Sequence, residues 1–486
     1  MLFNSFSFLV FFPIVFILYW VLNKNFKAQN ILLLVASYYF YSCWDWRFLF
    51  LLIFSTALDF YSGKLIDCHK LNLTRQRFIL ILSISINLGL LLVFKYNDFF
   101  ISSFFDLFQS LGFSVNKYLL NLILPVGISF YTFHGLSYVI DIKNKKITPE
   151  TNFINYSLFV SFFPLLVAGP IERATHLLPQ IKKLRVANYS KIIDGLRQVL
   201  WGLFKKIVIA DQVSIYVNQI FGASDQFSGA VLLLGSILFT IQIYGDFSGY
   251  SDIALGTARM MGFELLQNFN YPYFSRNLGE FWRRWHISLS SWFRDYLYIP
   301  LGGSKVSFFR KIINVFIIFI VSGFWHGPNW TYIVWGAANA FFVLPSVLLK
   351  RKKKNEEIVA VNSIFPTLKE LIQLSFTFLL VVILFTIFRA PSIVFVFDFF
   401  KLMILDLFNL ESIIKAYNFI YWNLGYQIPI YIFIFFSVEW LGRKTKSPLS
   451  LLSKTKPITN QILYLILVVM ILFYSGVENE FIYFQF

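Results

Sequence analysis

Long apolar runs separated by short basic segments extend along the whole chain. Many of these runs are nearly free of charge over about 17 residues or more, which is long enough for a helix to cross roughly 30 Å of hydrocarbon. The pattern predicts an all-α, polytopic integral membrane protein with about ten to twelve transmembrane helices and further re-entrant or interfacial helices. The predicted apolar segments lie near residues 5–22, 30–43, 47–62, 78–95, 119–140, 153–169, 193–221, 228–245, 312–325, 330–349, 371–388, 424–441 and 460–476.

The absence of a long polar region favours a single membrane domain over residues 1–486. The first run, Phe3 to Leu22, has no basic residue before it and no small-residue cleavage site after it, so we expect a spanning helix and not a signal peptide. The charged segment 350–357 is expected to divide the domain. We expect a core at 1–349, a catalytic region within it at 240–349, and a C-terminal helical bundle at 358–486.

Composition supports the same class of protein. The 486 residues are 57% hydrophobic and 14% charged, whereas soluble globular chains are about 45–50% apolar and about 25% charged. The net charge of +17 comes from basic residues in the short loops, which is typical of cytoplasmic loops facing anionic lipid and not of nucleic-acid binding. By this rule the N-terminus lies outside, and the loops near 64–77, 143–146, 182–206, 276–311 and 350–354 lie inside.

One histidine stands in a break between two apolar segments. His326 belongs to the sequence SGFWHGPNW, whose glycines and proline interrupt a helix. Unwound backbone is unfavourable in lipid unless it is buried in protein or lines a wet cavity, and an ionisable side chain there indicates function. Lys311 lies inside and Trp325 follows 14 residues later, which is about 21 Å of helix. We therefore expect a hairpin that carries His326 within the membrane, beyond its midplane.

The residues around this break suggest chemistry. Imidazole is the side chain best suited to act as a general base near neutral pH, so His326 is the first catalytic candidate. Asn329 offers a side-chain amide that could steady an oxyanion, and Trp325 adjoins the histidine. The alternative for His326 is a structural role, in which it caps a helix or bonds a neighbouring carbonyl. Its placement inside the membrane favours function.

The stretch Gly279–Pro300 combines charged and aromatic residues at helix spacing, which predicts an amphipathic helix at or dipping into the inner face of the membrane. His286 stands four residues after Trp282, so the two would share a helix face. His286 is a second acid/base candidate or a contact to an acyl donor, and the alternative is an interfacial helix in an aromatic belt. Three arginines could bind donor phosphates or anchor the helix to lipid: Arg283, Arg284 and Arg294.

Asp246 and Asp252 lie at the end of an apolar span, in the sequence GDFSGYSD. Carboxylates at the end of an apolar span are unfavourable unless they bind a partner. The two aspartates could therefore contact substrate or orient a histidine. Structural support is the favoured alternative, with Gly245 and Gly249 allowing close helix approach. His134 follows another segment containing proline and glycine and could line the same cavity, although a role in the core or cavity wall is favoured.

Common catalytic and metal-binding motifs are absent from the sequence. It contains no Gly-x-Ser-x-Gly elbow, no His-Glu-x-x-His pair and no phosphate-binding glycine loop. Cys43 and Cys68 have neither metal-ligand nor disulfide spacing, and His69 and His176 lie in basic loops that water should reach. We therefore expect no metal site.

Several motifs together resemble those of the membrane-bound O-acyltransferase (MBOAT) family, specifically its alginate O-acetyltransferase type. The similarity extends over essentially the whole chain, and the combination of motifs is specific although each one alone is weak. The motifs are MLFNS at the start, LPVGISFYTF at 124–133, AGPI at 168–171, the stretches 246–252 and 281–292, YLYIPLGG at 296–303, GFWHGPN at 323–329 and FIYFQF at the end.

This resemblance implies a membrane O-acetyltransferase of the bacterial cytoplasmic (inner) membrane, with its helices around a central funnel. It implies that His326 is the family's catalytic histidine and His286 its second conserved polar position. It further implies acetyl-CoA as a cytoplasmic acyl donor with no bound cofactor, a polysaccharide acceptor such as alginate, and a separate periplasmic or extracellular acyltransferase as partner. His134 departs from the family, in which many relatives have glutamine at this position.

Other interpretations stay open. Within the enzymes, the acceptor could be peptidoglycan, or a teichoic acid that receives D-alanine from a carrier protein. Outside the enzymes, broken helices also suit a transporter of glycans or acyl donors. Transporters usually show matching breaks in two repeated halves, and this sequence has no such repeat.

Overall fold

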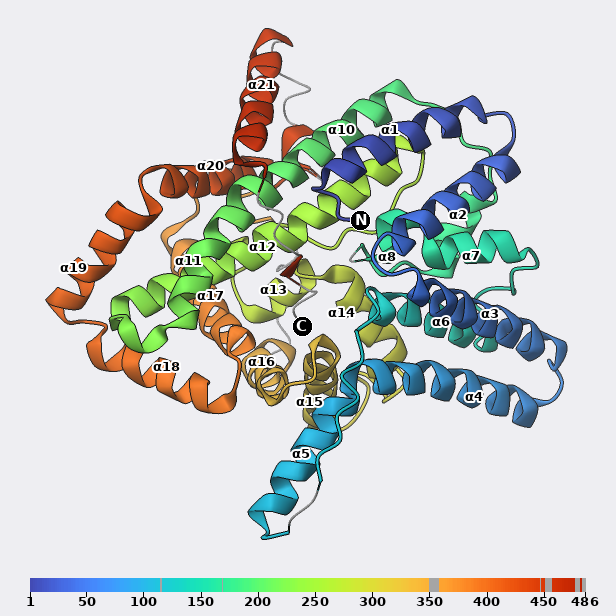
Figure 1. Cartoon of the computed structure of the whole chain (residues 1–486), viewed down its shortest axis with the longest axis horizontal. Coiled ribbons are helices and arrows are strands. Elements are labelled where there is room, and N and C mark those ends of the chain that lie inside the picture. Colours follow the sequence, from blue (N-terminus) through green and yellow to red (C-terminus); the bar gives the residue numbers. More distant parts are fainter. Residues whose placement is uncertain are drawn as a thin grey trace. The chain divides into compact units, whose positions relative to one another are not determined.

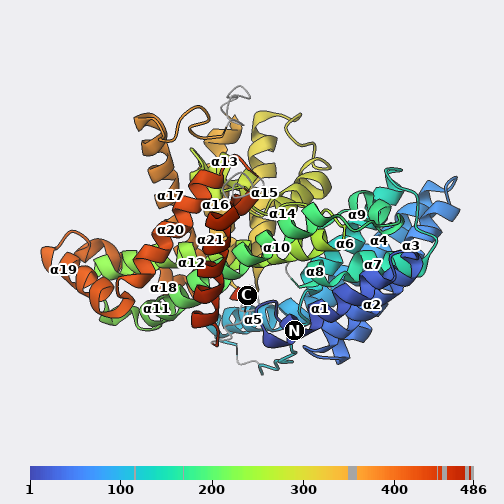
Figure 2. The ribbon, with the colours of Figure 1, turned by 90° about the horizontal axis from the view of Figure 1, so that it is seen from above.

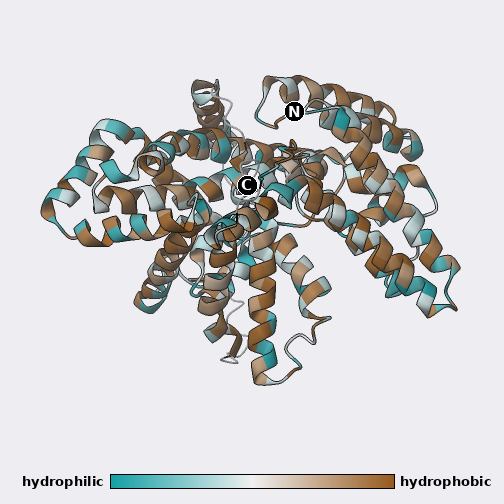
Figure 3. Cartoon of the chain, turned by 60° about the horizontal axis from the view of Figure 1, so that its bottom comes forward, coloured by the Kyte–Doolittle hydropathy of each residue, from teal (hydrophilic) through white to brown (hydrophobic). Residues whose placement is uncertain are grey.

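Helices make up all the regular structure in the described part of the chain (Figure 1). The structure is a computed structural model. It describes residues 1–113, 116–167, 169–348, 358–445, 447–450, 457–476 and 481–482. Hydrophobic residues predominate along the helices (Figure 3). The predicted all-α membrane fold is confirmed.

The chain forms two compact units. The first comprises Met1–Gly195 with Thr257–Leu266, and the second comprises Leu196–Gly256 with Gln267–Phe486. The charged segment 350–357, which we expected to divide a core from a C-terminal bundle, lies outside the described residues. The residues on either side of it belong to the second unit, so a division at this segment stays a prediction.

The first unit is a helical bundle held together by buried polar contacts as well as apolar packing. The Arg185 guanidinium donates hydrogen bonds to Tyr19 Oη (2.8 Å), Gln29 Oε1 (3.1 Å) and Asn30 Oδ1 (2.8 Å), which joins two helices to a loop. The helices are α1 (Phe6–Val21), α2 (Phe26–Ser42), α3 (Arg47–Cys68), α4 (Leu73–Leu91), η1 (Leu92–Tyr96), α5 (Asn97–Ser110), α6 (Ile128–Lys143), α7 (Phe153–Ser161), α8 (Phe163–Leu166) and α9 (Ala174–Ile181).

The second unit carries every predicted site residue except His134. Two helices, α10 (Tyr189–Leu203) and α12 (Gly229–Met260), contribute residues to both units. The other helices of the second unit are η2 (Phe204–Ala210), α11 (Asp211–Gly222), η3 (Ser224–Gln226), η4 (Pro272–Phe274), α13 (Leu278–Arg284), α14 (Ile287–Phe293), η5 (Arg294–Tyr298), α15 (Phe308–His326), α16 (Trp330–Leu348), α17 (Leu368–Arg389), α18 (Ile393–Asp406), α19 (Leu410–Phe419), η7 (Ile420–Leu424), α20 (Gln427–Gly442) and α21 (Pro457–Tyr474).

Six helices among the described residues are long and apolar enough to cross a membrane, and a bent pair that includes α19 and α20 would make a seventh. This number is below the ten to twelve that we expected, because some apolar segments are divided and others contain charged residues. The segment 153–169 breaks at Phe162 between α7 and α8. The segment 193–221 runs without a break through α10, η2 and α11, but it contains charged residues, among them Lys205, Lys206 and Asp211.

The helices α15 and α16 lie side by side as a hairpin (Figures 1 and 2). Glycines let their backbones approach closely: a Cβ at Gly323 would collide with the Tyr332 carbonyl, and a Cβ at Gly336 with the Phe319 carbonyl. Small residues at such crossings are typical of packed membrane helices. The hairpin predicted from the apolar pattern is confirmed, and its close packing fixes the turn at His326.

We expect Gly336→Ala to destabilise the protein, because the added methyl group meets a backbone carbonyl that cannot move by itself. Overpacking of this kind costs about 1–3 kcal/mol. Gly89→Ala is the matched control, since Gly89 also lies in a candidate spanning helix but has no described atom within 4 Å of its Cβ position. Thermal unfolding in detergent measures the difference. Equal melting temperatures for the two variants would contradict the close approach of α15 and α16.

Candidate active site

His326 is the last residue of α15, at the turn of the hairpin. Gly327 follows in an extended conformation (φ −175°), and α16 begins at Trp330. The predicted interruption between the two apolar segments is therefore confirmed. His326 is 4% exposed, so its side chain lies inside the protein at the point where the helix ends.

Aromatic rings surround the imidazole of His326. Its centroid lies 5.1 Å from that of Trp325, 5.2 Å from that of Trp335 and 5.3 Å from that of Phe388. In all three contacts the rings meet nearly edge to face, with interplanar angles of 77°, 89° and 84°. Large rings in this arrangement exclude water and limit rotation of the imidazole. A histidine held this way suits proton transfer in a dry site, where charges interact strongly.

Asn329, the candidate for steadying an oxyanion, is engaged with backbone. Its Oδ1 accepts a hydrogen bond from the Thr331 N–H (3.0 Å), which caps the start of α16. Its Nδ2 donates to the Pro391 carbonyl (2.8 Å) and so connects the turn to the segment between α17 and α18. The amide predicted for the oxyanion is therefore already used in holding the turn.

His286 lies at a break between α13 and α14. Its backbone is left-handed (φ 42°), a conformation that costs a non-glycine residue on the order of 1 kcal/mol. The single amphipathic helix expected over 279–300 is therefore wrong, and His286 does not share a helix face with Trp282. The helix breaks here because of tertiary packing, since the break lets both the Trp285 and the His286 side chains be buried.

The His286 imidazole belongs to the same aromatic cluster as His326. It packs edge to face on Phe247 (4.7 Å, 85°) and lies 6.0 Å from Trp325. Trp325 also contacts His326, so one indole touches both candidate histidines. Burial lowers the pKa of His286 to about 3, so this ring is neutral at physiological pH and can both donate and accept a hydrogen bond.

Asn268 holds the left-handed turn at His286. The Asn268 carbonyl accepts a hydrogen bond from the Ile287 N–H (2.9 Å), and its Oδ1 accepts one from Ser288 Oγ (2.6 Å). Its Nδ2 donates to Ser251 Oγ on α12 (3.1 Å). Asn268 is fully buried. Its contacts supply partners to backbone and hydroxyl groups that the helix break would otherwise leave unsatisfied.

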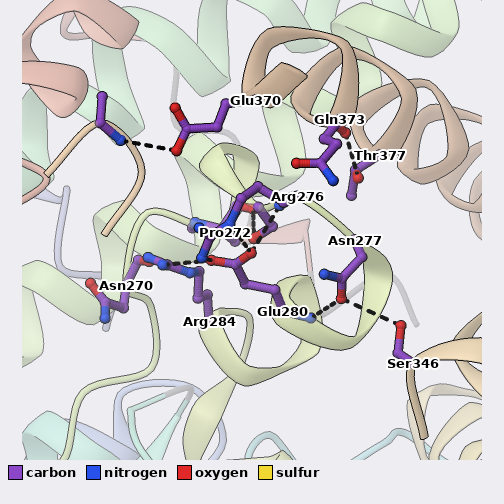
Figure 4. A network of polar contacts seen from close by, with 12 residues as sticks. Asn270, Pro272, Arg276, Asn277, Glu280, Arg284, Ser346, Glu370, Gln373 and Thr377 are labelled. Atoms are coloured by element: carbon purple, nitrogen blue, oxygen red, sulfur yellow. Dashed lines mark hydrogen bonds and ion pairs between the residues drawn. The ribbon is translucent and has the colours of Figure 1, made fainter. Parts of the chain in front are cut away.

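Glu280 binds two arginines beside this break (Figure 4). Arg276 Nε lies 3.0 Å from Glu280 Oε2, and Arg284 Nη2 lies 2.8 Å from Glu280 Oε1. Arg284 also donates to the Asn270 carbonyl (3.2 Å), and the Asn270 N–H donates to the Arg284 carbonyl (2.9 Å). This network anchors α13 to the preceding loop.

The arginines predicted to bind donor phosphates differ in their surroundings. Arg284 is buried in the ion pair with Glu280. Arg283 is exposed, and Arg294 is exposed beside Asp295 (2.8 Å). An anionic ligand can reach Arg283 and Arg294 without breaking a buried ion pair, whereas Arg284 already has a carboxylate partner.

Adjacent lysines neutralise the two aspartates of α12. Lys206 Nζ lies 2.9 Å from Asp211 Oδ1 and 2.8 Å from Asp246 Oδ1, and all three residues are buried. The second Asp246 oxygen accepts a hydrogen bond from the Ile482 N–H (2.7 Å). This cluster joins η2, α11, α12 and Ile482.

Lys205 forms a second buried cluster with Asp252 and Glu439. Gln198 Nε2 donates to Asp252 (2.7 Å), and Tyr244 Oη donates to Glu439 (2.6 Å). A cavity of about 30 Å³ adjoins these groups and is large enough for ordered water. The cluster therefore joins α10, η2, α12 and α20 around a small polar space.

These clusters correct two expectations. Asp246 and Asp252 were predicted at the end of a span, but α12 continues without interruption to Met260. Lys205 and Lys206 were predicted in a cytoplasmic loop, but both are buried. Mutual neutralisation explains both differences, because a paired charge can lie in a buried helix where a single charge is strongly unfavourable.

The remaining predicted histidine lies in the first unit. His134 is 1% exposed, and its Nε2 accepts a hydrogen bond from the Glu172 N–H (3.1 Å). The Glu172 carboxylate binds the His176 Nδ1 (2.7 Å) and raises the pKa of that histidine. His134 therefore has the core contacts favoured for it, and His176 is paired with a carboxylate instead of being fully solvated.

Comparison with known proteins identifies the family. Residues 43–354 match the model of MBOAT, the membrane-bound O-acyltransferase family. This chain belongs to the MBOAT family. It is a multi-pass membrane protein and an O-acyltransferase.

Two of the following curated relatives cover more than two thirds of this MBOAT protein, and a third covers less than half of it. The probable alginate O-acetylase AlgI of Pseudomonas aeruginosa is 38% identical over 395 residues, which cover 81% of this chain and 73% of the relative. The peptidoglycan O-acetyltransferase of Helicobacter pylori is 36% identical over 366 residues (69% and 68%). The teichoic acid D-alanyltransferase of Bacillus subtilis is 29% identical over 233 residues (45% and 58%). The resemblance to MBOAT proteins of the alginate O-acetyltransferase type is confirmed.

The MBOAT match ends before two helices that contribute to the candidate site and to the Lys205 cluster. Phe388 on α17 contacts His326, and Glu439 on α20 belongs to the Lys205 cluster, yet both residues lie beyond position 354. Sequence analysis missed residues that only packing brings to the two candidate histidines or to the two ion-pair clusters. They are Lys205, Lys206, Asn268, Trp335, Phe388 and Glu439.

The hydrogen bonds by which Asn268 holds the turn at His286, here called the Asn268 clamp, are expected to matter more for acyl transfer by this MBOAT protein than for its folding. Ser288→Ala deletes a hydroxyl that binds Asn268, and losing one such hydrogen bond costs about 1 kcal/mol of stability. We expect the transfer rate to fall about tenfold or more, because a small displacement of an active-site group is costly to rate. Ser291→Ala is the matched control, since its hydroxyl bonds the Ser288 carbonyl within the same helix. Equal rate losses in the two variants would contradict the clamp.

Proposed function

We propose that this MBOAT protein takes an acetyl group from acetyl-CoA on the cytoplasmic side of a bacterial inner membrane and delivers it towards hydroxyl groups of an exported polysaccharide. The observation that carries the proposal is His326, enclosed by aromatic rings at the turn of a membrane hairpin. Relatives named as alginate O-acetylases support acetyl as the acyl group and a polysaccharide such as alginate as the acceptor.

His326 acts as the general base in this proposal. An imidazole nitrogen removes the proton of the acceptor hydroxyl as its oxygen attacks the acetyl carbonyl carbon, which forms a tetrahedral oxyanion. The C–S bond of the donor then breaks, and the imidazolium returns its proton to the leaving thiolate. The rings around His326 keep out water that would otherwise hydrolyse the donor.

His286 assists in its neutral form. Its pKa of about 3 keeps it uncharged at physiological pH, so it serves as a hydrogen-bond donor or acceptor towards substrate and not as a second proton reservoir. Its contact with Trp325 places it in the same cluster as the base. The clamp by Asn268 fixes its orientation.

The proposal also includes binding partners. Membrane lipid covers the exposed apolar helices, and the exposed Arg283 and Arg294 are candidates for contacts with the phosphates of acetyl-CoA. A separate periplasmic or extracellular acyltransferase completes the transfer to the glycan.

Purified protein in proteoliposomes, supplied with radiolabelled acetyl-CoA and alginate oligosaccharides, tests the proposed function. We expect covalent transfer of labelled acetyl to sugar hydroxyls, or to the partner acyltransferase where that protein is supplied. Parallel reactions contain peptidoglycan fragments, or a teichoic acid with a D-alanyl carrier protein. Transfer only in one of these would replace the acceptor or donor, and movement of glycan or acetyl-CoA without covalent transfer would identify a transporter.

A further inference from the structure

Two buried donors on α16 have no hydrogen-bond acceptor among the residues that the structure describes. They are the Trp335 indole Nε1–H and the Thr331 hydroxyl. Trp335 is 1% exposed and Thr331 is fully buried. A buried donor without a partner is unfavourable, and folded proteins retain few of them. Each one therefore needs an explanation.

A neighbouring indole shows that the packing of α16 can supply acceptors. Trp282 Nε1–H donates to Asn339 Oδ1 (3.1 Å), and Asn339 Nδ2 donates to the Trp335 carbonyl (2.8 Å). The rings of Trp282 and Trp335 pack against each other, with 5.6 Å between centroids. One indole of this pair is thus satisfied by the fold, whereas the other keeps its N–H available.

The Trp335 side chain lies beside the candidate base, and Thr331 precedes it by one helical turn. Thr331 and Trp335 are four residues apart on the buried side of α16, so they project from the same face one turn apart. The Trp335 ring stands edge to face against the His326 imidazole, at 5.2 Å and 89°. A group that reacts at His326 would therefore meet the face of α16 that carries both donors.

We propose that Trp335 Nε1–H and Thr331 Oγ–H donate hydrogen bonds to the carbonyl oxygen of the acetyl group during its transfer at His326. The proposal rests on the proposed function of that site. When the acceptor oxygen adds to the carbonyl carbon, the π electrons move onto the carbonyl oxygen; when the C–S bond breaks, that pair re-forms the double bond. The two donors keep their protons throughout. Fixed donors in a site without water stabilise this transient negative charge more strongly than water does.

The first test exchanges the indole for an isostere in the full-length protein reconstituted in membranes. Benzothienylalanine at position 335 replaces the N–H by sulfur and keeps the bicyclic ring. The same replacement at Trp282 is the matched control, because a satisfied N–H is lost there. With acetyl-CoA as donor, we expect kcat to fall about 100-fold at position 335 and to stay within about twofold at position 282. KM for acetyl-CoA should stay unchanged at position 335, since the bond forms only in the transition state.

The second test concerns the hydroxyl. Thr331→Val removes it with little change in shape, and we expect kcat to fall about tenfold. Thr331→Ser keeps the hydroxyl and should retain the wild-type kcat. Melting temperatures of the purified variants separate this effect from misfolding, because only rates of folded protein are compared.

The outcomes distinguish this inference from the proposed function. If the position-335 isostere and Thr331→Val both keep the wild-type kcat while His326→Ala is inactive, the proposed donor role is refuted. The role of His326 as general base is then retained. Full activity of His326→Ala would overturn the proposed function itself. An equal fall in kcat for the isosteres at positions 335 and 282 would show that the replacement acts by disturbing the ring packing. That result would also refute the donor role.

Discussion

His326→Ala is expected to abolish acetyl transfer while the protein remains folded in the membrane. A general base contributes about 10²–10⁴-fold to rate, so we expect a loss of about 10³-fold in kcat for labelled acetyl transfer. Because the imidazole is enclosed by rings on its sides, alanine also leaves a cavity. His326→Phe refills that space without a basic nitrogen and should be equally inactive.

Controls for this result use another histidine of the chain. His69 lies at the end of α3 with its Nδ1 next to the Leu65 carbonyl (2.8 Å), and His69→Ala should keep the wild-type rate. Size-exclusion profiles and melting temperatures in detergent show whether each variant is folded. Near wild-type transfer by the folded His326→Phe variant would refute the catalytic assignment.

Lys206→Met is expected to cause the largest loss of stability. The substitution leaves the buried Asp211 and Asp246 carboxylates without the ammonium group that lies 2.9 Å and 2.8 Å from them. Removing one partner of a buried ion pair typically costs about 3–5 kcal/mol, because the remaining charge has no compensation. We expect a large fall in melting temperature and in the yield of folded protein.

The matched control for Lys206→Met is the same change at an exposed ion pair. Lys191 Nζ lies 3.1 Å from Glu264 Oε1, but both side chains are about half exposed. An exposed pair contributes about 0–1 kcal/mol, so Lys191→Met should leave the melting temperature almost unchanged. Similar melting temperatures for the two variants would mean that the Lys206 cluster contributes no more than a surface pair.

Much of the architecture could be predicted from local sequence. The apolar runs at 312–325 and 330–349 correspond to α15 and α16, and the Gly-Pro sequence between them correctly indicated the break at His326. These features depend on residues close together in the chain, namely the length of an apolar run and the residues that end a helix. The same holds for the MBOAT resemblance, which the family match confirms.

Helix boundaries near charged residues could not be predicted in this way. Asp246 was expected at the end of an apolar span, where a carboxylate is unfavourable unless it binds a partner. The helix α12 instead continues past it, since Lys206, 40 positions earlier in the chain, supplies the opposite charge. Likewise the helix pattern at 279–300 gave no sign of the break at His286, which depends on Asn268 and on the burial of two rings.

Local sequence is sufficient for the membrane class, the hairpin and the histidine at its turn, because composition and helix-ending residues act over a few neighbouring positions. Tertiary structure decides which charges are neutralised and which backbone conformation His286 adopts. It also decides which buried donors on α16 lack an acceptor among the described residues. These properties depend on side chains that are distant in sequence and adjacent in space. The availability of the Trp335 N–H, next to an indole whose N–H is satisfied, is a consequence of that packing alone.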